Sequence, residues 1–129
     1  MITAQQLLID APAHQLGRAM IIHGALRQNR HADAVFSLIN AAQETRGTPW
    51  SLHCIELAEW SLNHIDRHGS QTEQTAFIAG LLDLHGQRIR AQRLDIDAAV
   101  ILANTHLAAG KSPSGALSEG YKILRMAKP

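Results

Sequence analysis

The 129-residue chain is poor in cysteine, aromatic residues, valine and charge. Its single cysteine, Cys54, excludes an intramolecular disulfide framework and is typical of a reducing compartment. Charged residues make up 18% of the chain and leave a net charge of +1, which argues against binding a nucleic acid. The longest apolar run, Ala98–Ala103, is far shorter than the roughly 20 residues that cross a bilayer. Residues 1–12 lack the pattern of a secretory signal, so we expect a cytoplasmic protein that binds neither membrane nor nucleic acid.

Alanine and leucine dominate the apolar residues that are present. The chain has 20 Ala and 16 Leu against two Val, a balance that favours helix over strand. Its length suits one domain. The sequence therefore predicts a single all-α domain over residues 1–129, built as a stack of helical hairpins or an irregular bundle.

Glycines and capping residues divide the chain into helices. Two helix starts are indicated by Thr48–Pro49 and Ser112–Pro113, in which the hydroxyl can cap and the proline fills the first helical position. Ser70 or Thr72 can cap another helix, as can Asp95 or Asp97. Helix stops are predicted where a glycine follows a periodic segment, at Gly47, Gly69, Gly86 and Gly110. The predicted helices are 12–29, 31–45, 49–67, 71–85, 97–109 and 113–127, with a turn or short helix within 87–94.

The spacing of apolar residues predicts which helix faces are buried. Residues 98–109 are apolar nearly all round, so we expect helix 97–109 to be the central one. In helix 31–45 the buried stripe is predicted to be Ala32, Val35, Phe36, Ile39 and Ala42. Glycine inside a helix costs up to ~1 kcal/mol relative to alanine, which suggests close helix contacts. Such contacts are expected at Gly17, Gly24, Gly80, Gly115 and Gly120.

Three passages share the form of a turn between paired helices, namely residues 25–34, 84–91 and 107–116. In each, a small turn residue (Asn29, Gly86 or Gly110) precedes a basic or polar residue and a later alanine. This form resembles the turn of tetratricopeptide repeats, although spacings of 57 and 24 residues match no regular array with a period of 34. For a chain this short, the resemblance implies the class of small bacterial type III secretion chaperones, which hold a partner's helix in a concave groove.

Eight histidines are the one unusual supply of titratable groups. His64 and His68 are four residues apart and join His53 and Glu56 on one face of the predicted helix, as a metal site requires. That face is also where a surface helix carries its solvated residues. We expect no metal site and no cofactor, with His53, Glu56, His64 and His68 as the candidates should one exist.

No catalytic signature is present in the sequence, and we do not expect an enzyme. Cys54 follows His53, but adjacent helix residues point about 100° apart, so the two do not form a nucleophile and base. Arg88, Arg90 and Arg93 make 86–93 the most basic segment. Without interleaved aromatic residues, this segment is interpreted as a solvated connector.

Trp60 lies on the polar face of its predicted helix, where it either marks a protein contact or is covered by a neighbouring segment. The leading hypothesis is a non-catalytic protein interaction module, which would be an adaptor, a chaperone-like protein or a secretion-associated protein. It binds another protein or its own copies through a helical face or groove. The expected partner-binding residues are Trp50, Leu57, Trp60 and Tyr121. The alternative is a small helical enzyme or ligand-binding bundle that uses His23, His53, His64 or, best placed in an interior pocket, His106.

Overall fold

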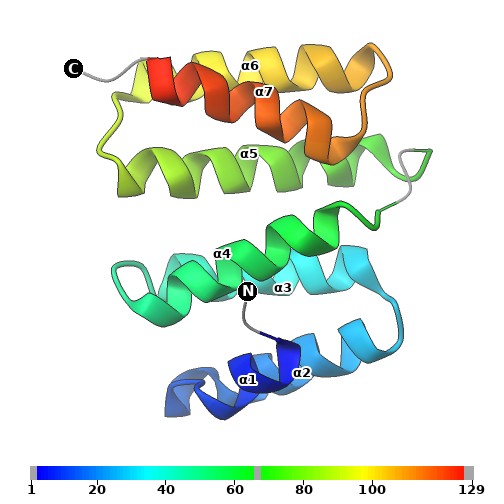
Figure 1. Cartoon of the computed structure of the whole chain (residues 1–129), viewed down its shortest axis with the longest axis vertical. Helices are drawn as coiled ribbons and strands as arrows, with labels where there is room; N and C mark the ends of the chain where they lie inside the picture. Colours follow the sequence, from blue (N-terminus) through cyan, green and yellow to red (C-terminus); the bar gives the residue numbers. More distant parts are fainter. Residues whose placement is uncertain (1–2, 66–67, 127–129) are drawn as a thin grey trace. The chain divides into compact units, whose positions relative to one another are not determined.

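A computed structural model describes residues 3–65 and 68–126 of the chain (Figure 1). Within these residues the chain forms seven α-helices and no strand, which confirms the all-α class. The helices cluster into two compact units, residues 1–65 and 66–129, and each is described by itself. That the two units make up one domain stays a prediction.

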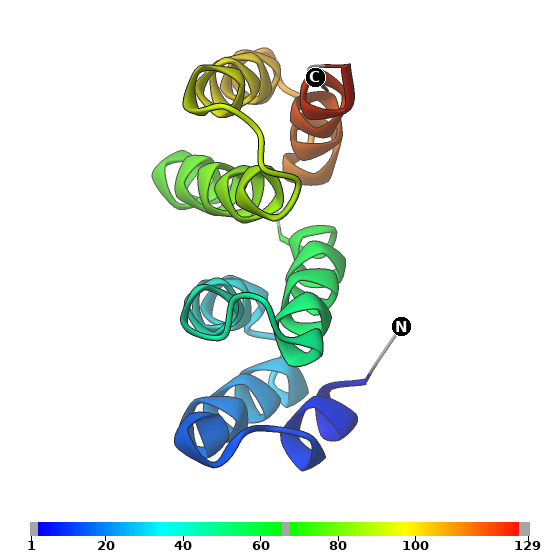
Figure 2. The same ribbon diagram turned by 90° about the vertical axis from the view of Figure 1, so that its left-hand side faces the viewer.

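The first unit contains four α-helices and one 3₁₀ turn. They are α1 (Ala4–Ile9), the turn η1 (Ala13–Gln15), α2 (Leu16–Arg27), α3 (His31–Glu44) and α4 (Pro49–Leu62). Helix α3 packs against both α2 and α4, and the six-residue α1, which sequence analysis missed, packs against α2 and α4 (Figure 2). The Trp50 indole N–H on α4 donates a hydrogen bond of 3.0 Å to the carbonyl oxygen of Leu7. This bond helps to hold α1 against the hairpin.

The second unit contains α5 (Gln71–Arg88), α6 (Arg93–Ala108) and α7 (Pro113–Met126), and each helix packs against the other two. Glycine allows the closest approaches. A Cβ at Gly86 would stand 2.4 Å from Cγ1 of Ile96, and one at Gly120 would stand 2.7 Å from Cδ1 of Leu82 and 3.2 Å from the Ala99 carbonyl oxygen. Close contact is therefore confirmed at Gly120. At Gly17 and Gly24 the same expectation is wrong, because nothing lies within 4 Å of a Cβ placed there.

The predicted helix starts at Thr48, Ser70 and Ser112 are confirmed. Each side-chain oxygen accepts a hydrogen bond from the backbone N–H three residues later, at 3.2, 3.3 and 3.1 Å respectively. The predicted start of α6 at residue 97 is wrong, because the helix begins at Arg93 after Gln92. Asp95 and Asp97 therefore lie within the helix, where a carboxylate near the N-terminus still interacts favourably with the helix dipole.

Three turns between helices share one hydrogen-bond pattern, in which a left-handed residue ends the helix. The residue that follows the left-handed one donates its backbone N–H to the carbonyl oxygen five residues earlier in the chain. These hydrogen bonds run from Arg30 to Ala25, from Ala91 to Gly86 and from Lys111 to His106. The left-handed residues have φ values of 58° at Asn29, 59° at Arg90 and 100° at Gly110. Gly47 also has a positive φ of 87°, so the stops predicted at Gly47 and Gly110 are confirmed.

The stop predicted at Gly86 is wrong. Helix α5 continues to Arg88, and Gly86 is buried inside it because Ile96 occupies the space that a side chain would need. Helix α4 ends at Leu62, five residues before the predicted end and well before Gly69, and residues 66 and 67 lie outside the described part of the chain.

Two burial predictions also need correction. Phe36 is 62% exposed, because the core stripe of α3 runs through Val35, Leu38 and Ile39 instead. Helix 97–109 is not a central, enclosed helix. The observed helix, α6, buries one stripe of side chains against α5 and α7. Ile101, which lies outside this stripe, is 67% exposed. A helix in a three-helix unit has neighbours on one side only, so apolar residues all round do not guarantee enclosure.

Candidate interaction surface

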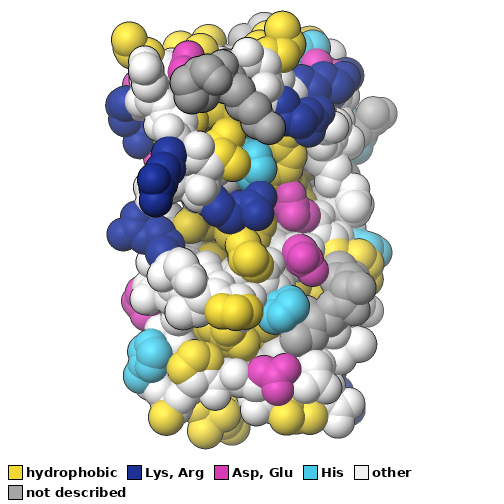
Figure 3. Space-filling model, turned by 60° about the vertical axis from the view of Figure 1, so that its left-hand side comes forward, with side chains coloured by type: hydrophobic (Ala, Val, Ile, Leu, Met, Phe, Trp, Pro, Cys, Tyr) yellow, Lys and Arg dark blue, Asp and Glu magenta, His cyan; other side chains and the backbone are white. Residues whose placement is uncertain are grey.

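Helix α2 has an exposed apolar face opposite the side that packs in the core. Ala19, Ile22 and Ala25 are buried against the rest of the unit. Leu16, Met20 and Ile21 are 47%, 59% and 60% exposed. The helix is apolar on nearly every side, and one packing partner of ordinary length, α3, can cover only part of it. Figure 3 shows how hydrophobic side chains stand among polar and charged ones on one face of the molecule.

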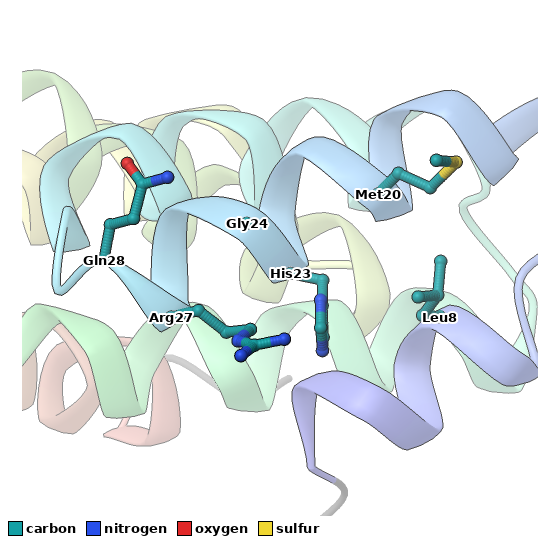
Figure 4. Close-up of a pocket in the computed structure, with 6 residues that line it drawn as sticks. All are labelled: Leu8, Met20, His23, Gly24, Arg27 and Gln28. Carbon is teal, nitrogen blue, oxygen red and sulfur yellow. The ribbon is translucent and has the colours of Figure 1, made fainter.

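A hollow of about 520 Å³ lies beside this face, between α1 and α2 (Figure 4). It is lined by Leu8, Met20, His23, Gly24, Arg27 and Gln28. Leu8 and Met20 lie toward one end, and the Arg27 and His23 side chains turn toward the gap beside α1, whereas Gln28 points away (Figure 4). Gly24 leaves the α2 wall open, because a Cβ there would meet no atom of another segment within 4 Å.

Like Arg90 and Arg125, and unlike Arg18 and Arg30, Arg27 has no carboxylate partner among the described residues. In residues 3–65 and 68–126 its guanidinium makes no ion pair or hydrogen bond. Arg18 instead pairs with Glu44 at 2.6 Å, and Arg30 pairs with Asp33 at 3.2 Å. The Arg18 hydrogen bond holds the pKa of the Glu44 carboxyl below its usual range. The hollow therefore has an apolar part and an uncompensated cation.

Two of the predicted partner-binding residues are core residues. Trp50 is 6% exposed and hydrogen-bonded to α1, and Leu57 is 3% exposed. Their predicted place on a free surface is wrong, because α4 packs against both α1 and α3 and buries the side of the helix that carries them. Neither side chain is available to a partner in this structure.

Trp60 is 39% exposed and belongs to a cluster of rings with His31 and His64. The His31 and His64 rings stack at 4.8 Å between centroids, and Trp60 lies 4.3 Å from His64 and 5.7 Å from His31. Burial, and then the charge of His64, lower the pKa of His31. Trp60 is thus covered on one side by the histidines, and part of its ring still reaches solvent.

The remaining predicted partner residue, Tyr121, lies on α7 and is half-buried. Its ring stands 4.8 Å from that of His85 on α5. Burial, and then the positive charges of Arg88 and Arg125, lower the pKa of His85. In the nearby basic segment, Arg93 pairs with Asp83 and Asp97 at 2.7 and 3.2 Å. Tyr121 thus packs against His85 within the second unit, and its place on a partner-binding surface stays a prediction.

The metal candidates His53, Glu56, His64 and His68 do not share one helix face as predicted. Helix α4 ends at Leu62, so His64 and His68 lie beyond it, and the Nδ1 atom of His64 lies 2.9 Å from the Trp60 carbonyl oxygen. Among the described residues, no three histidine, cysteine or acidic side chains come together as metal ligands. Stacked imidazoles such as His31 and His64 also direct their lone pairs along separate planes, which does not suit a shared ion.

The other sequence candidates occupy ordinary positions. Burial raises the pKa of the Cys54 thiol to about 12, so the residue is an inert thiol at neutral pH. His23 lines the hollow and is half-buried. His106 does not lie in an interior pocket. It is partly exposed, with its Nε2 atom 3.9 Å from the Glu119 carboxylate, which also accepts bonds from Lys111 and Lys122 at 3.1 Å.

Sequence reasoning missed Met20, Ile21, Gly24 and Arg27 as surface residues. The available signal was the segment Ala19–Ile22, which places large apolar side chains on adjacent sides of a helix. Its two neighbouring helices, α3 and the six-residue α1, leave part of those sides exposed. The hollow itself depends on the position of α1, which no local pattern in the sequence specifies.

No protein-family model, curated protein or solved structure matches this chain. In the part of the chain that the structure describes, no helix has both the length and the apolar character needed to span a bilayer.

Proposed function

We propose that this protein is a non-catalytic interaction module, adaptor-like or chaperone-like, that binds a partner protein through the exposed apolar face of α2. The observation that carries the proposal is the exposure of Leu16, Met20 and Ile21 on a helix whose opposite side is core. Apolar side chains gathered on one helix face are typical of surfaces that bind another helix.

The exposed area is large enough to contribute to binding. Full burial of a leucine, isoleucine or methionine side chain is worth about 1.5–3 kcal/mol, and each of these three is roughly half exposed. Covering them yields on the order of 3 kcal/mol before any polar contact is counted. This supports a contact that needs further anchors nearby, which the hollow beside Met20 supplies.

The second unit offers a matched comparison. Helix α6 also exposes large apolar side chains, with Leu94 at 78% and Ile101 at 67%. None of the residues that line the hollow comes from α6. We therefore place the partner-binding surface on α2 and use α6 as the control.

A photo-reactive benzoylphenylalanine at position 20 tests the proposal in cells that produce the protein. We expect a discrete cross-linked partner from position 20 and none from the same residue at position 94. Ile21→Glu should remove the adduct, because it places a carboxylate at the edge of the apolar face next to Met20, and Ile101→Glu should leave it unchanged. Equal adducts from both positions, or an adduct that survives Ile21→Glu, would contradict the proposed function.

A further inference from the structure

The shape and charge of the hollow specify more about the partner than the apolar face does. Met20 and Arg27 are seven residues apart on α2, so their side chains leave the same side of the helix about 10 Å apart. Leu8 adds apolar surface from α1, and His23 lies between Met20 and Arg27. A ligand that fills the hollow thus meets the apolar side chains of Leu8 and Met20 at one end. The cationic group of Arg27 lies one to two turns of α2 farther along.

Charge complementarity selects a negative group for the cationic end. None of the six lining residues is acidic, and Arg27 makes no ion pair within the described residues. Arg18, Arg30 and Arg93, by contrast, each have a carboxylate within 3.2 Å. An arginine at an apolar surface without an intramolecular carboxylate favours a carboxylate from outside, which its planar fork can bind through two hydrogen bonds.

We infer that the hollow receives an amphipathic helix of a partner protein that carries an aspartate or glutamate one to two turns from its large apolar residues. This inference rests on the proposed function. A helix satisfies its own backbone hydrogen bonds, whereas an extended peptide would need backbone donors and acceptors that the side of α2 does not offer. The face from Leu16 to Arg27 is about 17 Å long, which corresponds to about three turns of a partner helix.

Gly24 fits this arrangement. It lies between the apolar and cationic parts of the hollow, and the space above it is open. A large side chain of the partner helix can therefore reach the α2 backbone at this point. A leucine at position 24 would occupy the same space without meeting any neighbouring segment at its Cβ, so Gly24→Leu blocks the hollow and keeps the helix.

The probe is a phage-displayed library of amphipathic helices of about 16 residues, selected on the full chain. We expect the enriched peptides to share large apolar residues at helical spacing and an acidic residue at a fixed distance from them. Fluorescence anisotropy then measures their affinities for the protein variants. Gly24→Leu should weaken binding about tenfold or more, and Ile101→Glu on α6 should leave it unchanged.

A charge exchange tests the assigned contact directly. Arg27→Glu should weaken the acidic peptide about tenfold, and replacing the peptide's acidic residue with lysine should restore binding to that variant. The control is Arg30→Glu, which removes a cation that already pairs with Asp33 and should show no rescue. Circular dichroism of each variant checks that the helical content is kept.

Several outcomes overturn the inference. The first two are a library that yields no binder and enriched peptides that share no acidic residue. The third is tighter binding of dodecanoate, a fatty acid with an apolar chain and a carboxylate, than of any peptide. The fourth is a charge exchange that does not restore binding. If Ile21→Glu abolishes peptide binding and Arg27→Glu leaves it unchanged, the assigned carboxylate is wrong and the proposed α2 surface stands. If neither substitution has an effect, both proposals fail.

Discussion

Helices α2 and α7 both contain glycines, yet the glycines have opposite surroundings. On α2, Gly17 and Gly24 face open space, and a Cβ there would have no neighbour within 4 Å. On α7, Gly120 is buried against the Leu82 side chain and the Ala99 carbonyl oxygen. The same residue type therefore marks an uncovered surface in the first unit and a tight contact among three helices in the second.

This difference shows what a glycine inside a helix indicates. Each such glycine costs up to about 1 kcal/mol relative to alanine, and a close approach to a neighbouring helix can compensate for that cost. In α7 the compensation is visible as packing against α5 and α6. In α2 no such packing is present at Gly17 and Gly24, so both glycines leave the helix backbone open.

The largest expected effect comes from Gly120→Ala. The added methyl would stand 2.7–2.8 Å from two terminal carbons of Leu82, so this fully buried side chain must shift within a packed core, and the Ala99 carbonyl oxygen at 3.2 Å must also give way. We expect the free energy of unfolding to fall by about 2 kcal/mol, a typical cost of overpacking. Urea unfolding followed by circular dichroism measures the change, and an unaltered midpoint would contradict the close packing of α7.

The same variant tests whether the chain is one domain. Both tryptophans, Trp50 and Trp60, lie in the first unit, so their fluorescence reports on that unit, whereas Gly120 lies in the second. A single cooperative domain requires the fluorescence midpoint to fall together with the midpoint from circular dichroism. A fluorescence midpoint equal to that of the unmodified protein would instead establish two units that unfold independently.

A smaller effect of the opposite sign is expected for Gly24→Ala. Alanine has the higher helix propensity, and its methyl group meets no neighbouring segment, so the free energy of unfolding should rise by up to about 1 kcal/mol. Tryptophan fluorescence during urea unfolding is the measurement, and Gly17→Ala should behave alike. Destabilisation by Gly24→Ala would mean that the α2 face is already packed in solution and would remove the contrast with α7.

The fold was predictable where a local cause determines it. Thr48, Ser70 and Ser112 cap helices through bonds to residues three positions later, and these starts can be found in the sequence. The role of Gly86 inside α5 cannot be found in the same way, because it depends on Ile96, a residue of the next helix. The turn is made by Arg90 at a positive φ, a conformation for which an arginine side chain gives no signal.

The candidate surface was less predictable than the fold. Trp60 has a partly exposed ring, but it lies on α4 and not on the α2 face, so its role in partner binding stays a prediction. Trp50 was assigned to the same surface, although it fills the space between α1 and α4, because α1 itself was not expected. Burial depends on which segments pack together, and a short helix such as α1 has too few residues to show a clear apolar period.

The smallest expected effect is a loss of stability on acidification. Its first cause is the same in both units, and its second cause differs. In both, burial is the first cause that lowers a histidine pKa, that of His31 in the first unit and of His85 in the second. The unfolded chain therefore binds protons more readily than the folded one, so the free energy of unfolding falls as the pH decreases below about 6.5. Both rings reach solvent, and we expect less than about 1 kcal/mol for each.

The second cause distinguishes the units. The charge that opposes protonation of His31 comes from another imidazole, that of His64, whereas His85 is opposed by the guanidinium charges of Arg88 and Arg125. Urea unfolding between about pH 7.5 and 5.5 should show a shallower loss of stability in His31→Gln and, to a lesser degree, in His64→Gln. In the second unit, Arg88→Gln should bring the pKa of His85 closer to its ordinary value and also make the loss shallower. An unchanged slope in His31→Gln would show that stacking against His64 and Trp60 does not exclude the protonated ring, and the distinction between the units would then rest on the glycines of α2 and α7 alone.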